Sequence, residues 1–169
     1  MGDTPEWADE GYRGRPIEPR EDVRATYCRK VAETLLKRSG VTQPPVPVRH
    51  LAEKAGLAVV EADLSRGVDA VLKPEERVIE IARGQAGVRQ RFSIAHELGH
   101  HCLGHAHGES DVGEQQANIF AGALLVPRAW VKRDLPIEKT PEALARKYEV
   151  SSPTMFIALK DARLLNKIP

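Results

Sequence analysis

The five residues His-Glu-Leu-Gly-His at positions 96–100 combine residue types and a spacing that suit metal-assisted hydrolysis. Residues four positions apart lie on one face of a helix, so His96 and His100 can bind a single zinc ion. Glu97 can reach a water molecule on that ion without binding the metal itself. Zinc lowers the pKa of such a water toward about 7, and a carboxylate can take its proton during attack on a carbonyl. The motif therefore predicts a zinc site with Glu97 as general base.

A catalytic zinc ion needs a third protein ligand and one open position. The extended pattern H-E-x-x-H-x-x-G-x-x-H is excluded, because the chain has Leu103 and Ala106 where that pattern requires Gly and His. Several acidic and histidine side chains follow the motif closely enough to supply the third ligand. They are His105, His107, Glu109, Asp111 and Glu114.

Glu114 is the favoured third ligand. We expect it to begin a helix over residues 114–125, whereas residues 105–113 are expected to form a loop, and a ligand on a helix is held more rigidly. Asn118 lies one turn further along the same helix face. An amide at that position could orient one of the motif histidines.

The remaining polar residues near the motif have less defined roles. His101 points about 100° away from His100 around the helix, which favours a position outside the zinc site. Cys102 faces away from the metal and, like Cys28, is interpreted as a small buried apolar residue. Four side chains could stabilise an oxyanion, and the sequence does not rank them: His101, His105, His107 and Tyr148.

The elements that position the motif follow from hydrophobic periodicity. Helical periodicity begins at Glu21 and ends at Ser39-Gly40. Three short apolar segments are predicted as strands of a small sheet, at 57–62, 69–72 and 77–82. Further helices are predicted at 48–55, 89–103, 114–125, 141–148 and 153–164. This order indicates an α+β fold.

The chain is expected to divide into three parts. Residues 1–20 are rich in Pro and Gly and are expected to form a flexible arm. Residues 21–135 are expected to form the core that carries the zinc site. Residues 136–169 are expected to form a helical segment that packs on this core.

Composition narrows the function classes. The 169 residues carry a net charge of +1, so no large positive field is present to attract nucleic acid or an anionic membrane. Two cysteines cannot form a disulfide framework, which favours a reducing compartment. No apolar run approaches the roughly 18 residues of a membrane helix, and the first 20 residues contain no apolar signal core. We therefore expect a cytoplasmic location.

Residues 91–127 resemble the ImmA/IrrE metallopeptidases. The shared features are Arg-Phe-Ser-Ile-Ala-His-Glu-Leu-Gly-His at 91–100, followed by Glu114, Ala117-Asn118, Phe120-Ala121, Leu124-Leu125 and Pro127. The resemblance implies a zincin-like fold, with zinc bound by His96, His100 and Glu114 and with Glu97 as general base. Gln116 departs from the family, which often has Glu immediately before the Ala-Asn pair, so this position is not expected to be a ligand.

The resemblance also implies a substrate class, namely helix-turn-helix transcriptional repressors, and a role in stress responses. An extended segment of such a repressor could add to an edge of the small sheet. Two alternatives remain from the residues alone: a zinc-containing DNA-binding regulator, and an inactive zincin that binds protein. Oligomeric state is not predicted.

Residues 144–159 resemble a helix-turn-helix, in which Glu149 replaces the usual turn glycine. Residues 140–169 contain five basic and three acidic side chains, a weak charge for contacts to phosphate. The favoured interpretation is a helix pair that packs against the core of the chain through Leu144, Tyr148, Met155 and Leu159. Direct nucleic-acid binding is therefore not expected.

Overall fold

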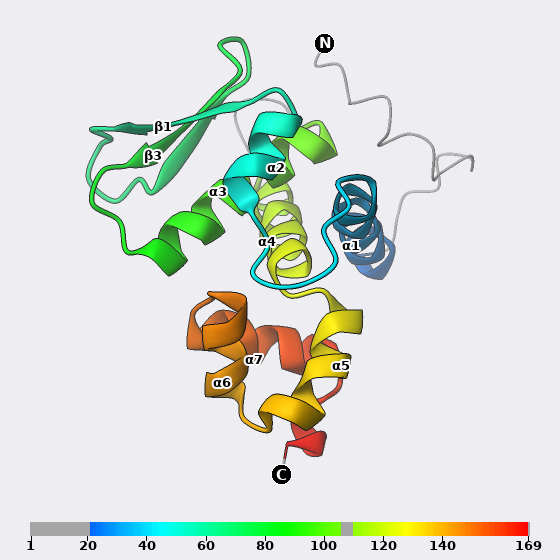
Figure 1. Cartoon of the computed structure of the whole chain (residues 1–169). Helices are drawn as coiled ribbons and strands as arrows, with labels where there is room; N and C mark the ends of the chain where they lie inside the picture. The colour runs from blue at the N-terminus through cyan, green and yellow to red at the C-terminus, as the bar shows by residue number, and fades with distance from the viewer. Residues whose placement is uncertain (1–20, 106–109, 169) are drawn as a thin grey trace.

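The computed structural model of the chain describes residues 21–105 and 110–168. The expected flexible arm at 1–20 and the candidates His107 and Glu109 lie outside these residues. The described elements follow one another as helices, a small sheet, and helices again (Figure 1). They are α1 (Glu21–Arg38), α2 (Val48–Lys54), β1 (Ala58–Ala62), β2 (Ala70–Lys73), β3 (Val78–Ala82), α3 (Gly87–Leu103), α4 (Asp111–Leu125), α5 (Arg128–Glu138), α6 (Pro141–Tyr148), α7 (Ser152–Asp161) and a 3₁₀ turn at Leu165–Lys167. The predicted α+β class with three strands is confirmed.

The sheet has the strand order β1-β3-β2, with β3 in the centre. β1 pairs with β3 in parallel, and β2 pairs with β3 in the antiparallel direction. In β3, the buried Ile79 and Ile81 alternate with more exposed residues, the pattern of a strand with one face on the core. β2 is an edge strand, and α3 packs against it and against β3.

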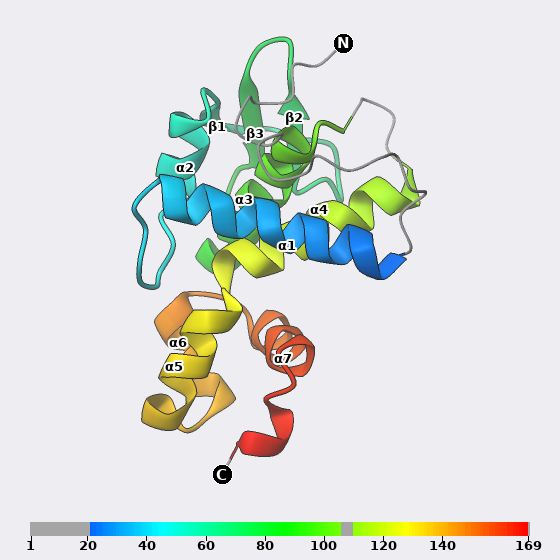
Figure 2. The ribbon, with the colours of Figure 1, turned by 90° about the vertical axis from the view of Figure 1, so that its right-hand side faces the viewer.

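Helices α3 and α4 form the centre of the molecule, and α1 packs along α4 (Figure 2). Gly99 permits the close approach of α3 to α4. A Cβ atom at this position would lie 2.9 Å from Cδ1 of Phe120 and 3.3 Å from the backbone of Ala117. Real Cβ atoms do not come this close to their neighbours, so the glycine of the HELGH motif sets the distance between the two helices.

Helix α4 begins three residues before the predicted start at Glu114. Ser110 is its N-cap, and the Ser110 hydroxyl accepts a hydrogen bond from the Gly113 backbone N–H at 3.2 Å. Asp111 lies in the first turn, where a negative charge is favourable. The expected loop therefore ends at residue 110, and Glu114 lies within the helix.

Helix α5 was not predicted by the sequence pattern, which treated Pro127 as the end of helical structure. In the structure, Pro127 is the N-cap of α5, where its missing N–H removes no hydrogen bond within the helix. Only Val131 and Leu135 provide buried apolar residues in this helix, so its periodic signal is weak. The boundary expected at residue 135 falls inside α5, and the division of the chain into units stays a prediction.

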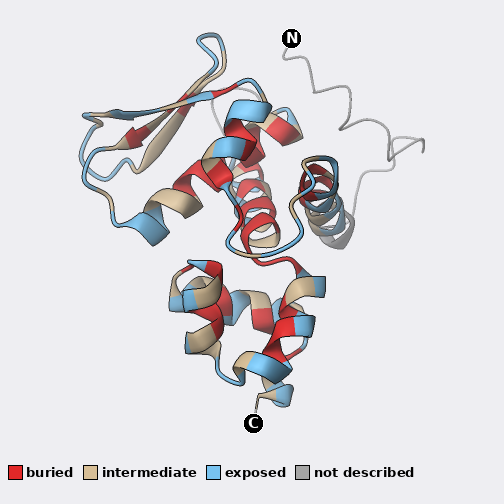
Figure 3. Cartoon of the chain, in the orientation of Figure 1, coloured by how far each residue is buried: buried red, intermediate tan, exposed pale blue. Residues whose placement is uncertain are grey.

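Helices α5, α6 and α7 pack together below the central helices, and buried residues line their facing sides (Figure 3). Leu144, Tyr148, Met155 and Leu159 are all fully buried, and the main contacts of α6 are with α5 and α7. Packing of residues 136–169 on the core stays a prediction. The turn between α6 and α7 contains Glu149 at φ 52°, the left-handed conformation that a glycine adopts more easily. No helix within residues 21–105 and 110–168 is long and apolar enough to cross a membrane.

Candidate metal centre

The structure brings His96, His100 and Glu114 together across the α3–α4 contact, and their potential ligand atoms all lie within 4.8 Å of one another. The two Nε2 atoms of His96 and His100 are 3.0 Å apart. The Glu114 carboxylate places Oε2 3.2 Å from Nε2 of His96 and Oε1 3.3 Å from Nε2 of His100. Three donor atoms thus converge on one point between the helices.

A hydrogen bond from α4 sets the tautomer of His96. Nδ1 of His96 lies 2.9 Å from Oδ1 of Asn118, which can only accept. Nδ1 therefore carries the hydrogen and donates, so that Nε2 of neutral His96 presents its lone pair toward His100 and Glu114. This is the orienting role that the sequence analysis assigned to an amide at position 118.

A two-step hydrogen-bond relay sets the tautomer of His100 in the same way. Nε2 of His105 lies 2.9 Å from Oε1 of Gln116, so this nitrogen carries a hydrogen and donates to the amide oxygen. Nδ1 of neutral His105 is then an acceptor, and Nδ1 of His100, 2.9 Å away, donates to it. Nε2 of His100 is left with a lone pair directed at Nε2 of His96.

This donor set fits a divalent metal ion. Two imidazole lone pairs and a carboxylate face one another, and without a cation or protons between them they repel. Zinc bonds of about 2.0–2.1 Å in a tetrahedron separate neighbouring ligand atoms by about 3.3 Å, close to the spacing of these atoms. Burial is the largest cause that lowers the pKa of His100 to about 4, and the neighbouring His96 and His105 act in the same direction. His100 is therefore neutral at pH 7, as a metal ligand must be.

Glu97 lies beside the three donor atoms without joining them. Its side chain is buried, and its Oε2 accepts a hydrogen bond from the Leu72 backbone N–H on the edge strand β2 at 3.0 Å. Burial raises the pKa of Glu97, while the neighbouring His96 and the Leu72 N–H act in the opposite direction. A carboxylate with a raised pKa is a stronger base, which suits it to take a proton from water.

Residues 52–159 match the family described as the IrrE N-terminal-like domain, Peptidase_M78. This match spans more than half of the chain. The chain belongs to this family. A solved structure of a transcriptional regulator from Mycobacterium tuberculosis has a similar fold, with a TM-score of 0.62 at 20% sequence identity. The similarity covers 85% of this chain and 48% of that protein, so the chain spans about half of the regulator's length. No curated protein matches the chain.

The membership in a peptidase family and the His-His-Glu cluster together support a metal-binding, peptidase-type domain. In this M78 domain, the other predicted candidates lie elsewhere. Asp111 is exposed in the first turn of α4, outside the metal cluster. His101 lies outside the metal cluster. Burial, and in second place the nearby Arg77, lower its pKa. The hydroxyl of Tyr148 is buried and donates to Asp134 at 2.9 Å.

Sequence reasoning missed the roles of Gln116 and of the Leu72 N–H in this M78 domain, and it left His105 among several alternatives. One signal for His105 was present. Gly104 ends α3 in the left-handed conformation, at φ 69°, so the chain reverses and His105 folds back beside His100. The part played by Gln116 depends on how α4 packs against this turn, which no local pattern encodes.

Proposed function

We propose that the chain is a zinc-dependent endopeptidase, with His96, His100 and Glu114 as zinc ligands and Glu97 as general base. The observation that carries this proposal is the pair of Nε2 lone pairs set by Asn118 and by the His105–Gln116 relay. Such outer hydrogen bonds are typical of metal-ligating histidines. Glu97 at the side of this cluster distinguishes a hydrolytic site from a structural zinc site, which is usually closed by four protein ligands.

A zinc ion bound there would supply a Lewis acid that polarises the scissile carbonyl and makes the attacking water more acidic. The proton transfers are then carried out by a residue of the chain itself. Glu97 accepts a proton from the attacking water and delivers it to the departing amine nitrogen. The Leu72 N–H holds the Glu97 carboxylate in place through its Oε2 atom, so the other oxygen is the one that exchanges the proton.

The proposed substrate is a protein, and we propose a helix-turn-helix repressor in the cytoplasm. Support comes from the resemblance to the ImmA/IrrE peptidases and from the structural neighbour, itself a transcriptional regulator. β2 is an edge strand of the sheet, so an extended segment could pair with its outer side. The Leu72 N–H is already donated to Glu97, so such pairing would use the other backbone groups of β2.

DNA binding by α6 and α7 has less support. A recognition helix presents polar and basic side chains to base edges. Helix α7 instead exposes Phe156 and Ile157, whose exposed fractions are 52% and 58%. This surface suits contact with protein better than contact with a phosphate backbone.

The decisive experiment compares the zinc-loaded protein with its Glu97→Gln variant. Purified candidate repressors and a degenerate peptide mixture are incubated with each, and the fragments are identified by mass spectrometry. Loss of one general base typically lowers the rate about 10²–10⁴-fold, while zinc content should not change. Equal cleavage by both proteins would remove Glu97 from the mechanism. Absence of cleavage together with a shift of operator DNA at physiological salt would favour the DNA-binding alternative.

A further inference from the structure

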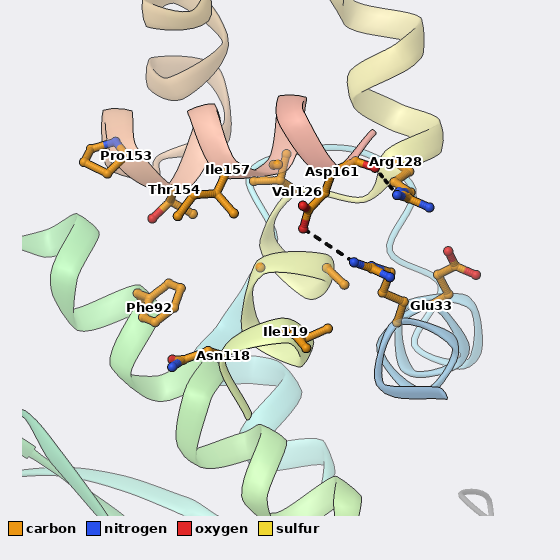
Figure 4. Close-up of a pocket in the computed structure, with 14 residues that line it drawn as sticks. Glu33, Phe92, Asn118, Ile119, Val126, Arg128, Pro153, Thr154, Ile157 and Asp161 are labelled. Atoms are coloured by element: carbon orange, nitrogen blue, oxygen red, sulfur yellow. Dashed lines mark hydrogen bonds and ion pairs between the residues drawn. The ribbon is translucent and has the colours of Figure 1, made fainter. Parts of the chain in front are cut away.

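A cavity of about 320 Å³ lies between the metal-site helices and the C-terminal helices (Figure 4). Helix α4 forms one wall, and α7 lies opposite, with contributions from α1, α3 and the start of α5. Most of its surface is apolar. Its apolar wall includes Phe92, Ile119, Val126, Pro153, Ile157 and Ala158.

The side chain of Asn118 separates the cavity from the metal ligand His96. Asn118 lines it, and the same residue accepts the hydrogen bond from Nδ1 of His96. Phe92 lies one helical turn before His96 on α3 and also lines the cavity. The cavity and the metal cluster therefore lie on either side of Asn118, along the contact between α3 and α4.

The size and the charges of the cavity restrict what it can hold. Ligand pockets typically measure about 300–1,000 Å³, and this one is at the lower end, which suits one or two side chains better than a cofactor. Two arginines at its rim already have partners: Arg29 lies 3.5 Å from the Asp161 carboxylate, and Arg128 donates to the Asp161 carbonyl oxygen. A neutral, apolar group is the occupant that these walls favour.

Gly122 keeps this space open. It lies in the middle of α4, where a glycine costs about 1 kcal/mol relative to alanine. A Cβ atom at Gly122 would meet no atom within 4 Å, so no close helix contact requires the glycine. This differs from Gly99 on α3, where packing against Phe120 excludes any side chain.

We propose that this cavity is the specificity pocket of the peptidase and that it binds one large apolar side chain, such as Leu, next to the bond that is cut. The proposal rests on the proposed function, since the side chain belongs to the peptide bound at the metal cluster. Selectivity then has two parts: strand pairing holds the peptide backbone, and the cavity between α4 and α7 chooses the side chain.

The first test measures occupancy without any cleavage. Binding of N-acetyl-leucinamide and of N-acetyl-alaninamide to the full chain is followed by ligand-detected NMR, with and without zinc. The leucine amide should bind about tenfold or more tightly, from the apolar area that its side chain buries. Gly122→Leu should abolish this difference by filling the cavity, and Gly122→Ala should keep it. Equal binding of the two amides by the unmodified protein would overturn the pocket, whether or not the protein is a peptidase.

The second test measures selectivity in cleavage. The peptide fragments should show a large apolar residue at one fixed position beside the cut bond, with a preference over alanine of about 10–200-fold. Gly122→Leu should move this preference to Ala or Gly. Ala123→Leu, at the next position on the cavity wall, serves as a second filling variant if Gly122→Leu does not fold. An unchanged preference in a folded filling variant would overturn the proposal, whereas no cleavage at all would count against the peptidase function alone.

Discussion

Two clusters of polar side chains, one around the buried Asp134 and one around the buried His100, have opposite character. Between α5 and α6, the Asp134 carboxylate accepts hydrogen bonds from Tyr148 at 2.9 Å and from Arg133 at 2.7 Å, and it lies 3.3 Å from the Lys147 ammonium. Every contact joins a donor to an acceptor. Between α3 and α4, two imidazole lone pairs and a carboxylate converge instead, so acceptors face acceptors.

The difference separates a structural use of charge from a functional one. The Asp134 network is complete within the chain, so it needs no further group and stabilises the contact between α5 and α6. The cluster of His96, His100 and Glu114 instead combines the side-chain types and spacing that bind a cation. The convergence of metal-binding side chains from two helices on one point is therefore the better indicator of a binding site, and the following variants test this contrast.

The largest effect is expected when a metal ligand is removed. Loss of an outer hydrogen-bond partner typically weakens metal binding about 10–100-fold. Glu114→Ala removes a ligand and should weaken zinc binding by more than this. Asp111→Ala is the matched control, because Asp111 lies one turn earlier on the same helix and outside the cluster. Zinc affinity is measured by competition with a chromophoric chelator. Equal affinities in the two variants would move the third ligand to another residue.

Asp134→Asn should destabilise the fold by about 2 kcal/mol, because Tyr148, Arg133 and Lys147 lose a charged acceptor. The hydrogen bond from Arg133, the largest cause, lowers the pKa of Asp134 below its ordinary value. A lowered pKa stabilises the fold above that ordinary value, and this contribution is lost as the pH falls below about 4. Urea unfolding at pH 7 and at pH 3 should show the two proteins differing at pH 7 and converging at pH 3. A constant difference would show that the charge is not responsible.

The relay behind His100 should contribute a smaller effect on the metal. Gln116→Met removes the acceptor for Nε2 of His105 and should weaken zinc binding about tenfold. Gln116→Glu keeps an acceptor oxygen at that position and should retain the affinity. If both variants bind zinc equally weakly, hydrogen bonding at position 116 does not explain the loss. The proposed effect of the Gln116–His105–His100 hydrogen bonds on zinc binding would then be wrong.

The smallest effect concerns the open cavity. Gly122→Ala should raise the free energy of unfolding by up to about 1 kcal/mol, since alanine favours the helix and its methyl group enters empty space. Gly99→Ala is the opposite case and should destabilise the fold, because its methyl group would collide with Phe120. Thermal unfolding of the two variants gives the comparison directly. Stabilisation by both would contradict the close α3–α4 packing.

Much of the fold and part of the site follow from local patterns. The three strands were predicted within one residue of their observed ends, because each is a short segment that contains the Val, Ile or Leu residues typical of small sheets. Helix α5 was missed because it begins after a proline and buries few apolar residues. The start of α4 was placed too late because the Ser110 cap was not recognised.

The sequence by itself determined that His96 and His100 share a face of one helix, with Glu97 beside them. Helix geometry places residues four apart on one side, whatever surrounds the helix. Only the tertiary structure decided that Glu114, Asn118 and Gln116 meet those histidines, and that a cavity opens beside Gly122. These contacts depend on how closely two helices pack at Gly99 and Phe120 and on where α7 lies. Such distances come from many side chains far apart in the sequence, so no local spacing records them.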